Sequence, residues 1–222
     1  MRTTRVLAAV AALSAALIGT PAHAAADEVA VLTTGSAGGT NVAVGDVVSA
    51  TIKAGTTADF ANSSGGTTGV KCAESAFTAT VVANPPAPGV ATESTTAQTF
   101  GSCTTNILGA TRVNSVVVNN APFNTTVESG TGKVTVTGTA TAPIQTTLKL
   151  GTILGSVTCV YVATSGSITG VSSNVDNSIA FTNQQFSKSS GPITCPASGF
   201  FTATYAPVLD TTVAGSPAVF TN

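Results

Sequence analysis

After Ala26 the chain alternates apolar and polar residues with a period of two, and helical periodicity is almost absent. Successive side chains of a β-strand point to opposite faces, so this alternation is typical of strands with one buried and one solvated face. In residues 133–137, for example, Val134 and Val136 would face the core while the threonines face water. Thr and Val are β-branched, which favours strands over helices. The sequence therefore predicts an all-β fold.

Short strands alternate with clusters of Gly, Pro, Asn and Ser, which form turns. The segments that carry the strand pattern are residues 28–34, 46–53, 76–83, 92–100, 111–118, 133–140, 144–150, 156–163, 178–182, 200–205 and 218–221. Many short strands with this punctuation predict an antiparallel β-sandwich, of immunoglobulin-like or jelly-roll-like type.

The N-terminus has the three parts of a secretory signal peptide. Arg2 and Arg5 give a positive start, residues 6–19 are apolar, and residues 22–24 (Ala-His-Ala) form a cleavage site. The apolar stretch is shorter than the ~20 residues that a membrane-spanning helix needs. Because the two arginines are not adjacent, the general secretory route is favoured over the twin-arginine route. We expect cleavage after residue 24 and a secreted, extracellular domain of residues 25–222.

Charge is scarce in this chain. Charged residues make up 8% of it, against ~25% in a typical soluble domain. Loss of residues 1–24 would leave 6 of the 8 basic residues against 9 acidic ones, a net charge of −3. Such a surface cannot neutralise phosphates or adhere to anionic lipid. We therefore expect no nucleic-acid partner and no membrane association after signal removal.

Four cysteines in an exported chain predict two disulfides, with three pairings open. We favour the sequential pairing, Cys72 with Cys103 and Cys159 with Cys195. Each loop closure is worth ~3 to 4 kcal/mol through the unfolded state.

A short repeat supports this pairing. Thr-x-Gln-x-Phe occurs at residues 96–100 and 182–186, upstream of the second cysteine in each pair. It suggests two related halves, residues 25–120 and 121–222. A competing self-match aligns residues 72–80 with 195–204, so the repeat remains open.

Catalytic motifs are missing. His23 is the one histidine of the chain and leaves with the signal, which excludes Ser-His-Asp and Cys-His catalysis. Ser49 and Lys53 stand one residue too far apart for a Ser-x-x-Lys motif. No Cys-x-x-Cys pair supports a zinc site. We therefore expect no enzymatic activity, no cofactor and no metal.

Several weaker candidates have a plain structural interpretation. Residues 130–134 (Gly-Thr-Gly-Lys-Val) lack the phosphate-loop spacing and favour a hairpin turn. Residues 174–177 predict a turn rather than a calcium site. The nine Phe are expected to pack the core. The acidic residues that could pair for glycoside cleavage, but that we expect on the solvated surface, are Asp46, Asp59, Glu74, Glu93, Glu128, Asp176 and Asp210.

Several motifs resemble those of a group of uncharacterised secreted proteins of Streptomyces-type actinobacteria. The segments that carry the likeness are residues 22–24 (Ala-His-Ala), 77–81 (Phe-Thr-Ala-Thr-Val), 142–147 (Ala-Pro-Ile-Gln-Thr-Thr), 157–161 (Val-Thr-Cys-Val-Tyr) and 181–186 (Phe-Thr-Asn-Gln-Gln-Phe). Such proteins are often labelled by a twin-arginine signal, from which the separated arginines of this chain depart. The resemblance covers most of the mature chain, implies an exported bacterial protein and brings no catalytic residue.

Three functions fit these expectations. The first is a non-catalytic structural or interaction protein of the bacterial exterior, with the cell wall, another secreted protein or a second copy as partner. The second is an extracellular carrier of an apolar small molecule, which requires an internal pocket lined by Phe and Val. The third is a protease inhibitor that presents the stiff, proline-rich loop of residues 84–89.

Overall fold

The structure, a computed structural model, describes residues 28–222, and the predicted signal peptide of residues 1–24 lies outside them. The described chain is all-β, as predicted. Its strands are β1 (Leu32–Thr34), β2 (Thr40–Asn41), β3 (Val47–Thr51), β4 (Ala58–Ala61), β5 (Gly69–Ala83), β6 (Val90–Thr105), β7 (Ala110–Asn119), β8 (Phe123–Glu128), β9 (Lys133–Thr137), β10 (Gln145–Thr152), β11 (Gly155–Ala163), β12 (Ser167–Ser173), β13 (Ser178–Ser190), β14 (Ser198–Tyr205), β15 (Leu209–Asp210) and β16 (Val219–Thr221).

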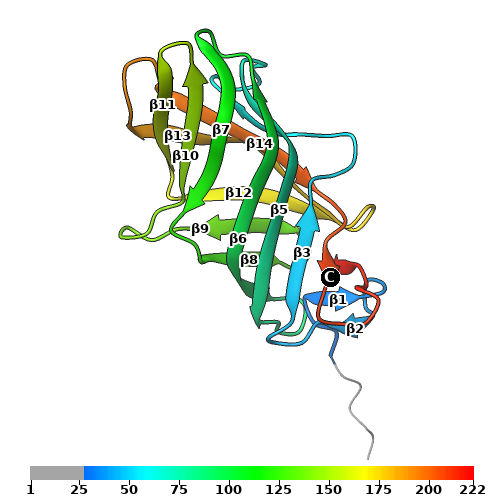
Figure 1. The fold of residues 1–222 in the computed structure, drawn as a ribbon. Coiled ribbons are helices and arrows are strands. Elements are labelled where there is room, and N and C mark those ends of the chain that lie inside the picture. Colours follow the sequence, from blue (N-terminus) through cyan, green and yellow to red (C-terminus); the bar gives the residue numbers. More distant parts are fainter. Residues whose placement is uncertain (1–27) are drawn as a thin grey trace, which may run out of the picture.

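Eight of these strands close into an antiparallel barrel. Around the ring the order is β4, β5, β6, β8, β9, β12, β13 and β14, and β14 pairs with β4 again. The long strands β5 and β6 run along most of the molecule (Figure 1). The predicted sandwich is therefore replaced by a single sheet that closes on itself. Both architectures bury one face of each strand, so the alternation of apolar and polar residues is the same in the two.

Strand β12 closes the ring, because it pairs with β9 on one side and with β13 on the other. Its Gly170 is buried between its neighbours. A Cβ atom at Gly170 would lie 2.8 Å from the carbonyl oxygen of Ala180 and 3.0 Å from the ring of Phe181. Glycine therefore allows β12 to approach β13 closely enough to complete the barrel.

A second group of strands extends the sheet beyond the barrel. The first part of β13 pairs with β12, whereas Phe186 to Ser190 pair with β11. From there the ladder continues through β10 to β7, at the upper end in Figure 1. At the opposite end lies a small sheet of β16, β1 and β2.

The side chain of Asn84 ties this small sheet to the connection between β5 and β6. Its Oδ1 accepts the N–H of Leu32 at 2.8 Å, and its Nδ2 donates to the carbonyls of Leu32 and Val42, each at 2.8 Å. These bonds help to satisfy backbone N–H and carbonyl groups in and beside this small sheet. The loop of residues 84–89 is thus anchored at its first residue.

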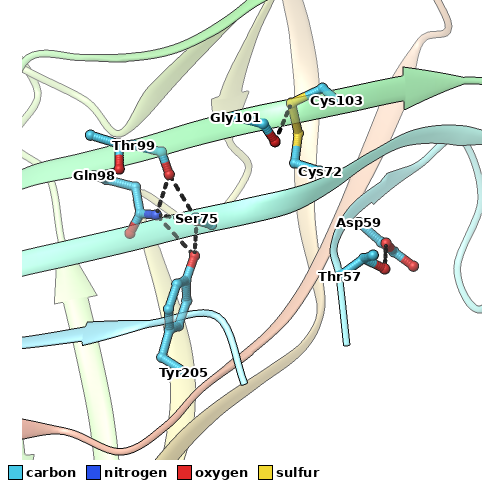
Figure 2. The surroundings of a disulfide bond; sticks show 9 residues. All are labelled: Thr57, Asp59, Cys72, Ser75, Gln98, Thr99, Gly101, Cys103 and Tyr205. Carbon is cyan, nitrogen blue, oxygen red and sulfur yellow. Dashed lines mark hydrogen bonds between the residues drawn. A yellow bond between two sulfur atoms is a disulfide. The ribbon is translucent and has the colours of Figure 1, made fainter. Parts of the chain in front are cut away.

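Both predicted disulfides are confirmed. Cys72 and Cys103 are cross-strand partners on β5 and β6 (Figure 2). Cys159 on β11 joins Cys195 in the connection from β13 to β14, with 5.7 Å between the Cα atoms. Paired cysteines persist in oxidising surroundings such as the outside of the cell. The bonding pattern is consistent with an extracellular protein.

A polar network beside the first disulfide joins β14 to β5 and β6 (Figure 2). The Oη of buried Tyr205 lies 2.9 Å from the Oγ of Ser75 and accepts the Nε2–H of Gln98 at 2.9 Å. Ser75 Oγ donates in turn to the carbonyl of Thr99 at 2.8 Å. Burial raises the pKa of Tyr205 to about 12, so its hydroxyl stays protonated. The network therefore satisfies the polar groups that this part of the wall buries.

Candidate functional site

Inside the barrel lies a cavity of about 70 Å³, which we call the main cavity to distinguish it from two smaller spaces beside it. Most of its wall is apolar. The aromatic side chains on it are Phe60, Phe77, Phe100, Phe123, Phe181, Phe186 and Phe201. The aliphatic ones are Val118, Val134, Val136, Ile144, Ile168 and Ile179.

The aromatic part of the wall is a packed cluster. The ring of Phe60 lies 5.1 Å from that of Phe100, edge to face, and 5.0 Å from that of Phe201. Phe181 continues the cluster at 6.3 Å from Phe201. These centroid distances are within the usual range of favourable aromatic pairs. Seven of the nine Phe thus pack as predicted and also line the main cavity.

Strands β6 and β8 supply a polar side to the same cavity. Glu93 and Thr95 stand two residues apart on β6, so their side chains share the inner face. The hydroxyl of Thr95 lies 2.6 Å from that of Thr125 on β8, and each could donate to the other. All three side chains are buried.

Glu93 is the unusual residue of this site. Its exposed fraction is 6%. No hydrogen bond or ion pair holds its carboxyl within residues 28–222, and burial raises its pKa from 4.5 to about 7. The predicted position of this carboxyl on the solvated surface is wrong, because β6 turns this position inward. Two positions on β6 flank Glu93 on the same face, Ala91 and Thr95, and both are buried.

Two smaller spaces adjoin the main cavity, each of about 20 Å³. The first shares the side chains of Phe60, Thr146 and Phe186 with it and extends toward Tyr161. The second, which we call the lower cavity, shares Glu93 with it and extends to the small terminal sheet. The interior is therefore a row of three spaces, with Glu93 in the wall between two of them.

The other candidate carboxylates are not part of this site. Three of them form surface ion pairs: Lys53 to Asp176 at 2.8 Å, Lys71 to Asp59 at 3.2 Å and Lys133 to Glu128 at 3.2 Å. The hydrogen bond from Lys53 lowers the pKa of Asp176. Glu74 is exposed on β5.

Asp46 and Asp210 lie close together outside the barrel wall. Asp210 is fully buried, and its Oδ2 has no hydrogen-bond partner in the described part of the chain. Burial, with the negative charge of nearby Asp46, raises the pKa of Asp210. The predicted surface position of Asp210 is wrong, because its short strand β15 packs against β3. A fully buried carboxyl cannot reach a sugar, so this pair does not form a glycosidase site.

The predicted turns are confirmed. Residues 129–132 connect β8 to β9, and residues 174–177 connect β12 to β13. Within residues 28–222, no three side chains of His, Cys, Asp or Glu come together as metal ligands. No helix long and apolar enough to cross a membrane occurs in that same part of the chain.

Comparison with known proteins gives no relative: no family model, no curated protein and no solved structure matches this chain. The resemblance to secreted actinobacterial proteins and the two related halves stay predictions. The barrel draws strands from both proposed halves: β4, β5 and β6 from the first, and β8, β9, β12, β13 and β14 from the second.

Proposed function

We propose that this protein is a secreted carrier that holds a small apolar molecule inside its barrel. The observation that carries the proposal is the cavity inside the barrel, with its wall of Phe, Val and Ile. An eight-stranded barrel is about wide enough for its own side chains or for one small ligand. The function is binding without catalysis, and the predicted signal peptide together with the two disulfides supports export.

The volume limits the size of the ligand. Sites for drug-sized molecules commonly span about 300–1,000 Å³, well above the main cavity at about 70 Å³. The adjoining spaces add length rather than width. A short aliphatic chain fits this shape better than a fused ring system.

We expect the protein to bind n-hexanol, measured by isothermal titration calorimetry, and to lose at least about tenfold in affinity on Val136→Phe. Val136 lies on β9 in the wall of the main cavity, and a benzyl group in its place would fill the space. The matched control is Val171→Phe on the neighbouring strand β12, where 56% of the side chain is exposed. This control should bind as the original protein does.

Circular dichroism would show whether each variant keeps its fold, and Ile168→Phe is a second way to fill the cavity. If no small apolar probe binds, or if hexanol binds equally well after the cavity is filled, the carrier function is wrong.

A second candidate is an interaction protein whose partner is another copy of this chain. Four aliphatic side chains are almost fully exposed: Leu108, Ile153, Leu154 and Ile193. They lie on the connections from β6 to β7, from β10 to β11 and from β13 to β14, and these connections are at the upper end of the ribbon in Figure 1. Since Thr152 pairs with Ala110, the first two connections are neighbours. Grouped exposed apolar residues are typical of protein interfaces.

If this end is an interface, Leu154→Asp should weaken self-association by at least about tenfold, measured by sedimentation velocity over a concentration series. The control is Val175→Asp, which is 97% exposed on the connection from β12 to β13, away from this end. A protein that stays monomeric at its highest soluble concentration would remove this candidate.

A further inference from the structure

The position of Glu93 indicates what kind of apolar molecule the cavity holds. This residue lies on β6 between β5 and β8, opposite Val81 on the first and Thr125 on the second. Glu93 lines both the main cavity and the lower cavity. Among residues 28–222, it is the one ionisable side chain in the walls of these two spaces.

A carboxyl group in an apolar interior is costly. Without a partner, its charged form loses several kcal/mol of solvation, and even its neutral form leaves hydrogen-bonding capacity unused. A valine, like Val81 directly opposite, would pack here without that cost. Buried carboxyls of this kind are concentrated where a protein binds or transforms something.

Building on the carrier function proposed above, we infer that the ligand is a small apolar molecule with a cationic amine, whose ammonium group binds the carboxylate of Glu93. The hydroxyls of Thr95 and Thr125 lie on the same inner face. An ammonium group has three N–H donors, so it can bond the carboxylate and a hydroxyl oxygen together. The apolar body then extends among the Phe side chains of the main cavity.

The negative charge of Glu93 disfavours ligands with a carboxylate or an alcohol headgroup. A carboxylate ligand would place two acidic groups side by side, which disfavours ionisation of both. An alcohol can form a hydrogen bond with Glu93 but cannot compensate its charge. An ammonium ion does both, and charge-assisted hydrogen bonds are about twice as strong as neutral ones.

The described residues around Glu93 supply no competing cation. The side chains that β5, β8, β9 and β13 contribute to the two cavities are Phe, Val, Ile, Thr and Ser, and the connection from β12 to β13 adds Asn174 and Asn177. None of these titrates between pH 4 and pH 9. A pH dependence of amine binding in this range would therefore report on Glu93 itself.

The test compares n-hexylamine, n-hexanol and hexanoate by calorimetry between pH 5 and pH 9. We expect hexylamine to bind at least about tenfold more tightly than hexanol at pH 8, and hexanoate least tightly. Hexylamine stays protonated over this range, so its affinity should rise about tenfold per pH unit while Glu93 is mostly protonated, and then level off. Hexanol should not show this rise.

Glu93→Gln should remove both the preference for the amine and its pH dependence, whereas Glu74→Gln on the exposed face of β5 should keep them. If all three probes bind with similar affinity, or if hexanol alone binds, the amine inference is wrong while the carrier function stands. If none binds, both are wrong. Should Glu93→Gln not fold, the probe comparison and the pH profile of the original protein decide the question.

Discussion

Replacing Cys159 and Cys195 together with alanine is expected to lower the free energy of unfolding by about 3 to 4 kcal/mol. The bond closes a loop with a sequence separation of 36 residues. Its loss increases the freedom of the unfolded chain, and loops of this length give an effect of that size. Both cysteines are buried, so alanine avoids placing a hydroxyl in the interior. Urea denaturation monitored by circular dichroism measures the change.

The folded state keeps other contacts at this position, which makes the unfolded chain the main source of the effect. Lys188 Nζ donates to the carbonyls of Pro192 and Cys195 at 3.3 and 3.1 Å, so the connection between β13 and β14 stays attached without the disulfide. The control is Ile193→Ala in the same connection, where the side chain is 97% exposed. This change should stay within about 0.5 kcal/mol. A loss below about 1 kcal/mol for the double variant would contradict the prediction.

The alternation of apolar and polar residues predicts most strands because it reports which side of a strand is buried. Residues 133–140 and 156–163 correspond to β9 and β11 with ends shifted by a few residues at most. The alternation does not indicate which strands pair with each other. The sequence therefore predicts an all-β chain correctly and gives no sign that the sheet closes.

The alternation of apolar and polar residues does not predict β12, the strand that closes the barrel. Strand β12 contains Ser167, Gly170 and Ser173, and Ser and Gly are weak strand formers. Strand β8 was missed for a related reason, since its inward position 125 is a polar Thr. In β12 the pairing with β9 and β13, rather than the intrinsic preference of Ser and Gly, determines the conformation.

The candidate site was hidden for a similar reason. In β6, Glu93 occupies an inward position between Ala91 and Thr95, and Ala and Thr occur on either face of a sheet. The sequence does contain one indication of the site: Ala91, Glu93 and Thr95 are two residues apart, so their side chains share one face of the strand. The outward phase of the same stretch carries Ser94 and Thr92, so both faces looked solvated. Only the pairing of β6 with both β5 and β8 identifies the buried face.

The effect of Glu93→Gln on the free energy of unfolding of the ligand-free protein is expected to depend on pH. At pH 8 this effect should be more stabilising than at pH 4 by about 3 kcal/mol. The pKa of Glu93 rises from 4.5 in the unfolded chain to about 7 in the fold. Between these values the folded state binds more protons than the unfolded state, so the original protein loses stability as the pH rises. Below pH 4.5 the carboxyl is neutral in both states and this penalty vanishes. Glutamine is neutral at every pH, so the variant does not have this cost of burying a charge.

The measurement is the difference in the free energy of unfolding between Glu93→Gln and the original protein, from urea denaturation at several pH values. Taking this difference cancels the contributions of the other groups, such as Asp176, whose lowered pKa acts in the opposite direction. We expect the difference to be constant below about pH 4.5, to grow up to about pH 7 and then to stay level. Glu74→Gln, on the exposed side of β5, should give a nearly flat difference. A flat difference for Glu93→Gln as well would mean that its carboxyl is solvated. In that case the main cavity would have no buried carboxylate to bind an amine.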